Sequence, residues 1–171
     1  GTDSSDRGGE GKFMKDIKVA FLDQNTAFNP DNTVFDEVYS GLGATYDTIR
    51  DYERAIASED QRRIGRAMAA MDAADAWNAE QKIKQVLSSL KLTRLDQRMG
   101  SLSGGEAKRV ALASMLLREA DFLIMDEPTN HLDTEVIEFL EDYLGKSRCT
   151  LLMVTHDRYF LDRVCNTIFE L

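Results

Sequence analysis

The chain has 171 residues, of which 43% are hydrophobic and 30% are charged, and its formal net charge is −9 at pH 7. This composition suits one folded domain. The charge argues against a direct nucleic-acid surface, because surfaces that bind the phosphate backbone are usually basic. No apolar run approaches the roughly 20 residues of a membrane span, and the first residues lack the pattern of a secretory signal. Two cysteines in no metal-binding spacing predict reduced thiols in a cytoplasmic protein.

The chain begins with residues 1–16, which we expect to form a flexible start. The first twelve are rich in Gly, Ser and Asp, and such a composition buries too little apolar surface to order itself. Residues 17–22, IKVAFL, then predict a short strand. It ends at three polar residues, of which Gln24 is the second.

Residues 31–99 predict an all-helical subdomain. The stretch contains no proline, and its apolar residues recur at three- and four-residue spacing. Thr33 followed by Asp36 predicts a helix cap, and Gly41 and Gly43 predict the end of that first helix. Three further helical segments follow, with apolar positions at Ile49, Tyr52 and Ile56, at Ile64, Ala67, Met68 and Met71, and at Trp77, Ile83, Val86, Leu87 and Leu90.

From residue 100 onward, helices and strands alternate. Helices are predicted at 106–119, 134–144 and 158–164, and strands at 122–126, 151–154 and 167–171. Strands that are apolar throughout predict a parallel sheet covered by helices on both faces. The predicted fold class is therefore α/β, with a core made of residues 17–30 and 100–171 and an inserted helical subdomain at 31–99, whose last helix continues over 103–119.

Two acids end the strand FLIMDEP, residues 122–128. The carboxyl ends of parallel strands are where open α/β sheets bind ligands. Adjacent side chains point in different directions, so the two acids cannot do the same job. In P-loop ATPases, whose acidic strand end this motif resembles, the first acid, here Asp126, holds Mg²⁺ at the phosphates, and Glu127 would then be placed to orient and deprotonate a water. Pro128 predicts an extended backbone at Glu127. The alternative is a strand that runs into a solvated acidic turn.

The next buried strand ends in THD, residues 155–157. His156 would emerge at the same edge of the sheet, where it could donate a hydrogen bond to a γ-phosphate. The alternative is a histidine that caps the following helix or packs under a loop. Gln24 follows the first strand, and its amide oxygen could ligate a metal.

LSGGE, residues 102–106, places two adjacent glycines before a helix. A helix N-terminus exposes unpaired N–H groups that attract anions, and glycine lets a phosphate approach the backbone. Ser103, Gly104 and Gly105 could thus contact a γ-phosphate. A Gly-Gly turn with a serine cap explains the same helix start.

Together these motifs closely resemble an ABC-type ATPase over residues 17–171. LSGGE matches the family signature, FLIMDE the Walker B strand, NHLD at 130–133 the D-loop, THD the switch histidine, and Gln24 the Q-loop glutamine. The resemblance implies a partial P-loop ATPase core with ATP and Mg²⁺ as cofactors. It implies catalytic roles for Glu127 and His156, metal contacts for Asp126 and Gln24, and nucleotide contacts for Gln24, Ser103, Gly104, Gly105, Glu106 and Asp133.

EPTNHLD together with THDRYFLDRV is most similar to the ABC-F class, soluble proteins with two ABC cassettes, several of which act on ribosomes. The helix in DAWNAEQKIKQVLSSL resembles the first cassette of such a protein. The implied partners are a second cassette and the ribosome. Two alternatives stay open: the ATPase subunit of a membrane transporter, and a non-enzymatic dimerisation or regulatory module.

The chain departs from the family at the Walker A loop, GxxxxGK[ST]. The nearest match, Gly11–Lys12, has Asp6 in place of the first glycine and Phe13 in place of the hydroxyl residue. We therefore expect the loop to lie upstream of residue 1, and we expect the 171 residues alone neither to bind ATP tightly nor to hydrolyse it. A sheet without the Walker A strand has an open edge, which predicts a homodimer, a swapped segment or a cover formed by the N-terminus.

Overall fold

A computed structural model describes residues 17–23, 27–40, 42–118 and 120–167. Its three strands form one parallel sheet in the order β1-β2-β3, with bounds β1 Val19–Leu22, β2 Phe122–Asp126 and β3 Thr150–Val154. In the register, Leu22 pairs with Met125, and Asp126 pairs with Val154. The α/β fold class is confirmed. The strand predicted at 167–171 falls almost entirely outside the described residues.

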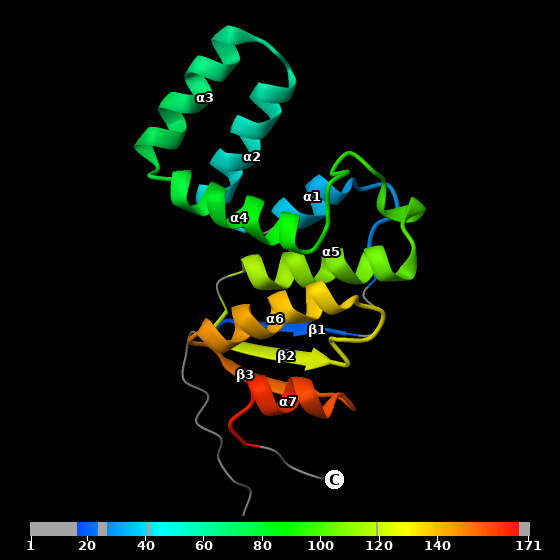
Figure 1. The fold of residues 1–171 in the computed structure, drawn as a ribbon. Coiled ribbons are helices and arrows are strands. Elements are labelled where there is room, and N and C mark those ends of the chain that lie inside the picture. The colour runs from blue at the N-terminus through cyan, green and yellow to red at the C-terminus, as the bar shows by residue number, and fades with distance from the viewer. Residues whose placement is uncertain (1–16, 24–26, 41, 119, 168–171) are drawn as a thin grey trace, which may run out of the picture.

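Three helices accompany the sheet: α5 Gly104–Leu117, α6 Thr134–Lys146 and α7 Arg158–Val164. Figure 1 shows α5 and α6 on one side of the sheet, whereas α7 lies beside the edge strand β3 and contacts α6. The chain therefore crosses from β2 to β3 through α6. A crossover through a helix is the usual connection between neighbouring parallel strands.

The remaining helices form a second layer, with bounds α1 Val34–Tyr39, α2 Ala44–Ala57, α3 Gln61–Ala73 and α4 Trp77–Ser89. In Figure 1, α1 and α4 lie over α5, and the antiparallel pair α2 and α3 projects farthest from the sheet. The predicted cap of α1 is confirmed, because Thr33 and Asp36 form a reciprocal capping box. None of the described helices is long and apolar enough to cross a membrane.

Helix α5 lies between the sheet and this helical layer. Its C-terminal half is buried on every side: Val110, Ala111, Leu112, Ala113, Ser114, Met115, Leu116 and Leu117. A helix that is apolar all round belongs in the interior rather than on a surface. Helix α5 therefore forms the centre of the core and joins the two layers into one body.

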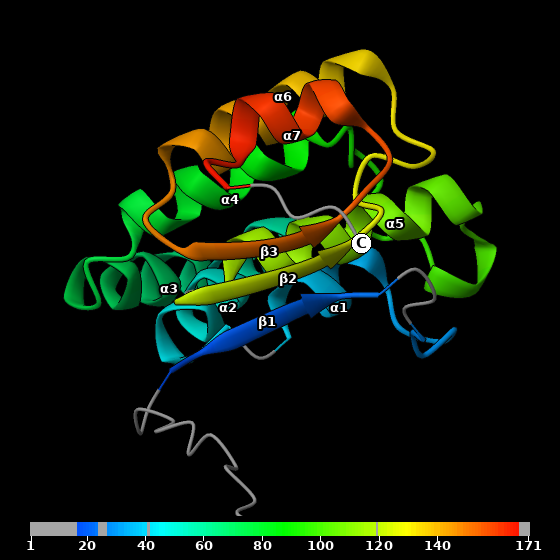
Figure 2. The same cartoon turned by 90° about the horizontal axis from the view of Figure 1, so that it is seen from below.

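The two faces of the sheet differ. Side chains alternate along a strand, and the face toward α5 is buried at Ala20, Leu22, Leu123 and Met125. The opposite face carries the exposed side chains of Val19, Phe21, Leu152 and Val154. Figure 2 shows this face in front, with most of the helices behind the strands. The expectation of helices on both faces is thus met on one face only within the described residues.

An aromatic pair joins the projecting helices to α4. The ring of Trp77 at the start of α4 stands edge-on to Tyr52 of α2, with 5.2 Å between ring centroids and 80° between planes. The indole N–H also donates to Oδ1 of Asp72 at 2.8 Å. Both contacts hold the base of the α2–α3 pair in place, because an edge-to-face pair and a charge-assisted hydrogen bond each favour one orientation.

Candidate functional site

The predicted residues of β2 and β3 meet at the carboxyl edge of the sheet. Asp126 ends β2 opposite Val154, the last residue of β3. The pairing continues one step further, since the N–H of Glu127 donates to the carbonyl of Val154 at 2.8 Å. Glu127 and the stretch from Thr155 to Asp157 therefore leave the sheet side by side.

Glu127 is a buried carboxylate, with only 6% of the residue exposed. Its Oε2 accepts a hydrogen bond from the hydroxyl of Thr155 at 3.2 Å, and its Oε1 lies 3.4 Å from Nε2 of His156. A solvated acidic turn would leave the carboxylate in water, so this structure contradicts that alternative. A carboxylate in this position can accept a proton from a bound water.

The backbone of Glu127 corrects the prediction drawn from Pro128. Its φ is +46°, in the left-handed region rather than the extended one. A residue with a Cβ adopts this region at a cost of about 1–3 kcal/mol, and only where its surroundings enforce it. Here they do, because hydrogen bonds hold both sides of the residue: its N–H is bound by Val154, and its carbonyl accepts from the ammonium of Lys108 and from the N–H of Asn130 at 3.3 Å.

His156 is free to meet a ligand. Its side chain is 98% exposed, so it does not pack under a loop. It does not cap α7 either, since that role falls to Asp157, whose Oδ1 accepts from the N–H of Phe160 at 3.1 Å. Both structural alternatives for this histidine are therefore wrong. Its imidazole lies beside Glu127 at the carboxyl edge of the sheet, where a ring N–H could donate to an anion.

Asp126 is suited to bind a magnesium ion whose other ligands are mainly phosphates and waters. Among the described residues its carboxylate accepts no hydrogen bond and forms no ion pair, so its oxygens are available to a hard cation. The same residues contain no group of three His, Cys, Asp or Glu side chains that could hold a metal. Mg²⁺ is commonly bound by one or two carboxylates with phosphates and waters completing the shell.

The signature segment caps α5. Ser103 is the N-cap, and its hydroxyl accepts from the N–H of Glu106 at 3.3 Å. The carboxylate of Glu106 returns to Ser103, accepting from its N–H at 2.9 Å and its hydroxyl at 2.8 Å. These bonds lower the pKa of Glu106 below its ordinary range, the main-chain bond most strongly. The serine-cap interpretation is therefore correct, but it accounts for the serine and the glutamate only.

The two glycines have no role in the folding of α5. Neither adopts a positive φ. A Cβ at Gly104 would meet nothing within 4 Å, and one at Gly105 would lie 3.5 Å from the carbonyl oxygen of His131, an ordinary contact. Their N–H groups, at the first turn of a helix, have no partner among the described residues, as is normal for helix starts. The absence of side chains leaves these amides open to an incoming group.

Asp133 links α6 to the helical layer. It is the N-cap of α6, accepting from the N–H of Val136 at 3.1 Å, and its Oδ1 lies 3.2 Å from the ammonium of Lys91. The bond from Val136 is the main reason why the pKa of Asp133 is lowered. The segment before it passes close to the signature, since a Cβ on Gly105 would lie 3.5 Å from the carbonyl oxygen of His131. The D-loop and signature segments thus lie next to each other.

The predicted site residues fall into two neighbouring groups. Asp126, Glu127 and His156 gather at the carboxyl edge of β2 and β3. The N-terminus of α5 points to the same side of the molecule, as the arrowhead of β2 and the start of α5 show in Figure 1. Gln24 lies outside the described residues, although β1 ends at Leu22 on this edge.

One residue at the site was missed from the sequence. Lys108 of α5 reaches the main-chain carbonyl of Glu127 with its ammonium. Burial lowers the pKa of Lys108, and the negative charges of Glu127 and Asp126 partly oppose this shift. The sequence contained one indication of this role: Lys108 lies two residues before Val110, where the helix becomes apolar. Its partner could not be read from sequence spacing, because the two residues meet only when α5 crosses the end of β2.

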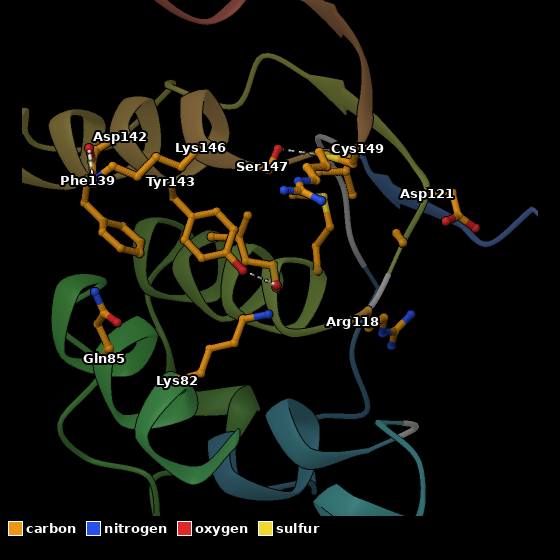
Figure 3. A pocket seen from close by; sticks show the side chains of 15 residues that line it. Lys82, Gln85, Arg118, Asp121, Phe139, Asp142, Tyr143, Lys146, Ser147 and Cys149 are labelled. Atoms are coloured by element: carbon orange, nitrogen blue, oxygen red, sulfur yellow. Dashed lines mark hydrogen bonds and ion pairs between the residues drawn. The ribbon is translucent and has the colours of Figure 1, made fainter. Parts of the chain in front are cut away.

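A separate cavity of about 590 Å³ opens at the opposite edge of the sheet, where β2 and β3 begin. Figure 3 shows Tyr143 of α6 and Lys82 of α4 on its walls. Several of its polar groups are already paired: the hydroxyl of Tyr143 donates to the carbonyl of Leu116 at 2.7 Å, and Lys146 pairs with Asp142. None of the predicted site residues lines it, so we place the chemistry at the carboxyl edge.

Comparisons with known proteins agree with the motifs. A family model described as ABC transporter matches residues 5–130. The uncharacterized ABC transporter ATP-binding protein YfmR of Bacillus subtilis is 44% identical over 95% of this chain and 27% of its own length. The energy-dependent translational throttle protein EttA of Mycobacterium tuberculosis is 39% identical over 90% of this chain and 29% of its own length. The chain thus spans less than a third of each of these relatives.

A solved structure gives the same result at the level of the fold. In a model of ribosome-bound archaeal Pelota and ABCE1, the matching chain has a TM-score of 0.59 and is 26% identical, over 94% of this chain and 23% of that one. The relatives are consistent with the ABC-F class that the sequence resembles. Because the family model covers more than half of its residues, the chain belongs to the ABC transporter family of ATP-binding cassettes.

Proposed function

We propose that the chain is part of an ATP-hydrolysing cassette of the ABC-F type. The carboxyl edge of β2 and β3 would act on the nucleotide of its own cassette, and the N-terminus of α5 on the nucleotide of a second one. The observation that carries the proposal is the buried carboxylate of Glu127, which is contacted by Thr155 and His156. It stands next to Asp126, whose carboxylate has no partner in the part of the chain that the structure describes.

In ATP hydrolysis, each residue at the carboxyl edge of the sheet would have a different role. Asp126, with Gln24 as a further proposed ligand, would hold Mg²⁺, which neutralises charge on the β- and γ-phosphates. Glu127 would accept a proton from the water whose oxygen attacks the γ-phosphorus, while the bond to the ADP oxygen breaks. The exposed imidazole of His156 would donate a hydrogen bond to a γ-phosphate oxygen.

The signature segment would complete the site of the partner cassette. The free amides of Gly104 and Gly105 and the hydroxyl of Ser103 suit the γ-phosphate of a nucleotide held by the other Walker A loop. Glu106 would act indirectly, by holding Ser103 in the capping box. Asp133, which adjoins the signature through the D-loop, would lie at the interface between the two cassettes.

The biological setting is proposed from relatives. One relative is named a translational throttle, and a similar structure is a model of a ribosome-bound complex. We infer that the parent protein acts in translation on the ribosome, in the cytoplasm, where the free Cys149 and Cys165 would stay reduced. The description of the matched family keeps the transporter subunit as a second candidate.

The decisive experiment uses a full-length protein of the relatives' size that carries this cassette. Glu127→Gln should reduce ATP turnover by at least about 100-fold while ATP stays bound, because the amide cannot accept the proton. Glu138→Gln, an exposed acid on α6, is the matched control and should leave turnover unchanged. Wild-type turnover in Glu127→Gln would remove Glu127 from the role.

The same trapped variant separates the two settings. An ABC-F protein with ATP bound should sediment with ribosomes in a sucrose gradient, whereas a transporter subunit should instead appear with membranes. Sedimentation with neither would favour the non-enzymatic module.

The 171 residues alone should not bind ATP tightly, because their sequence contains no GxxxxGK[ST] loop to supply the lysine and the phosphate-binding amides. Isothermal titration of the chain with ATP and Mg²⁺ checks this. Micromolar binding would contradict it.

A further inference from the structure

Lys108 connects the signature helix to the proposed general base. It lies on the second turn of α5, two residues after Glu106, and its ammonium donates to the main-chain carbonyl of Glu127. We propose that Lys108 is a positioning residue: it holds the backbone of Glu127 so that the carboxylate faces the attacking water. What Glu127 does chemically rests on the proposed function.

The backbone of Glu127 needs such a support. Its φ of +46° is unfavourable for a residue with a side chain, so the geometry persists only while hydrogen bonds enforce it. The bond to Val154 ties the N–H side to β3. On the carbonyl side the support comes from the ammonium of Lys108 and from the longer bond with Asn130, of which the charged donor is the stronger.

Loss of the ammonium would let the peptide unit after Glu127 rotate. The side chain would then move relative to Thr155 and His156, which follow β3 and contact the two carboxylate oxygens. A displacement of this kind alters the geometry of proton transfer without removing the base. The expected result is slower turnover with unchanged binding of ATP.

The surroundings of Lys108 favour a specific role over a general surface charge. The side chain is partly buried, and among the described residues it forms no ion pair. The two carboxylates that face it are those of Glu127 and Asp126, which attract its charge. A lysine that served only for solubility would extend its ammonium into water. Here the ammonium ends on the one carbonyl that precedes Pro128.

The placement also joins the two halves of the proposed site. The start of α5 would meet the nucleotide of the partner cassette, and Lys108 lies one helical turn further along the same helix. A small shift of α5 on contact with that nucleotide would reach the backbone of Glu127 through a single hydrogen bond.

The kinetic test uses the full-length protein. Lys108→Met keeps the apolar stem and removes the donor, and it should lower kcat on the order of 10- to 100-fold with KM for ATP unchanged. Lys108→Arg retains a cationic donor and should recover part of the loss. Lys146→Met, which removes an exposed lysine of α6, should behave as wild type. Wild-type kcat in Lys108→Met would overturn the proposal.

A second measurement needs no turnover. In the 171-residue chain, the ¹³C shift of the Glu127 carbonyl reports its hydrogen bonds. Lys108→Met should move this shift and those of Thr155 and His156, whereas Lys146→Met should not. An unmoved Glu127 carbonyl overturns the positioning role even if turnover falls. If the wild-type parent hydrolyses no ATP, the proposed function fails, and the carbonyl shift still decides the role of Lys108.

Thermal melting of each variant accompanies both tests. If Lys108→Met fails to fold, Lys108→Gln replaces it, because glutamine keeps a neutral donor of similar length. The proposal then expects an intermediate loss of kcat and an intermediate carbonyl shift. Wild-type values of both in a folded Lys108→Gln variant would contradict the need for a charged donor.

Discussion

The carboxylate of Glu106 accepts two hydrogen bonds from Ser103, one from its N–H at 2.9 Å and one from its hydroxyl at 2.8 Å. The serine hydroxyl in turn accepts from the N–H of Glu106. This reciprocal arrangement orders the first turn of α5 before any ligand arrives. The segment can therefore be both a helix cap and a phosphate site. The residues that cap α5 also hold in place the main-chain N–H groups that would meet the phosphate.

Loss of this cap should destabilise the chain. Ser103→Ala removes the hydroxyl that satisfies the N–H of Glu106, and substitutions of this kind cost about 1 kcal/mol. Urea denaturation of the 171-residue chain, followed by circular dichroism, measures the change. Ser88→Ala, at an exposed position of α4, is the control and should leave the midpoint in place. Equal midpoints for both variants would show that the cap contributes nothing.

The same pair predicts a dependence of stability on pH. Hydrogen bonds from Ser103 lower the pKa of Glu106 from its ordinary value of 4.5. The unfolded chain then binds the proton more readily than the folded one. The contribution of Glu106 is therefore fully present above the ordinary value and is lost as pH falls through the lowered pKa.

Glu106→Gln tests this prediction. The variant should lose less stability than wild type on acidification between about pH 6 and pH 2. The measurement is the urea midpoint at each pH, with Glu138→Gln as the control. A parallel decline in wild type and Glu106→Gln would contradict the role of the lowered pKa.

Gly104→Ala should separate stability from function. A Cβ at this position meets nothing within 4 Å, and alanine in a helix is more stable than glycine by up to about 1 kcal/mol. We therefore expect an unchanged or raised urea midpoint in the 171-residue chain. In the full-length protein the same methyl group should obstruct the partner's phosphate and reduce ATP turnover. A loss of both stability and turnover would mean that the glycine serves folding.

The core beneath the site should respond to truncation. Leu140 of α6 is fully buried, and replacing a buried leucine by alanine costs about 2–5 kcal/mol. Leu140→Ala should lower the urea midpoint accordingly. Ile56→Ala, at a position 43% exposed, should cost much less. A small effect at Leu140 would show that α6 is loosely packed on the sheet.

The open face of the sheet should promote self-association. Val19 and Phe21 of β1 and Leu152 and Val154 of β3 form an exposed apolar area, and such areas usually mark contacts with another surface. We expect light scattering of the 171-residue chain to give a mass above that of a monomer. Phe21→Lys should lower the mass. A monomeric wild-type chain would contradict this prediction.

Local patterns predicted much of the fold. The strand at 122–126 agrees at both ends with β2, and the cap at Thr33 was readable because a capping box is a local signal. The uncovered face of the sheet was not predicted, because the sequence pattern of an apolar strand is the same whether or not a helix covers it. What covers a face is decided by distant parts of a chain.

The candidate site likewise has features that the local sequence predicted and features that it did not. Asp126, Glu127 and His156 could be placed at one edge because parallel strands end together. The left-handed backbone of Glu127 was wrongly predicted as extended, since the local effect of Pro128 was outweighed by the hydrogen bonds that Glu127 donates to Val154 and accepts from Lys108. Tertiary contacts of this kind leave no trace in residue spacing.

Trp77 gives the molecule an internal optical reporter. It is the single tryptophan of the chain, and its ring contacts Tyr52 at the base of the projecting helices. It begins α4, which belongs to the helical layer over α5. Fluorescence excited at the indole will therefore follow the helical layer alone, whereas circular dichroism averages over every helix. If the two signals change together on unfolding, the helical layer and the sheet behave as one cooperative unit.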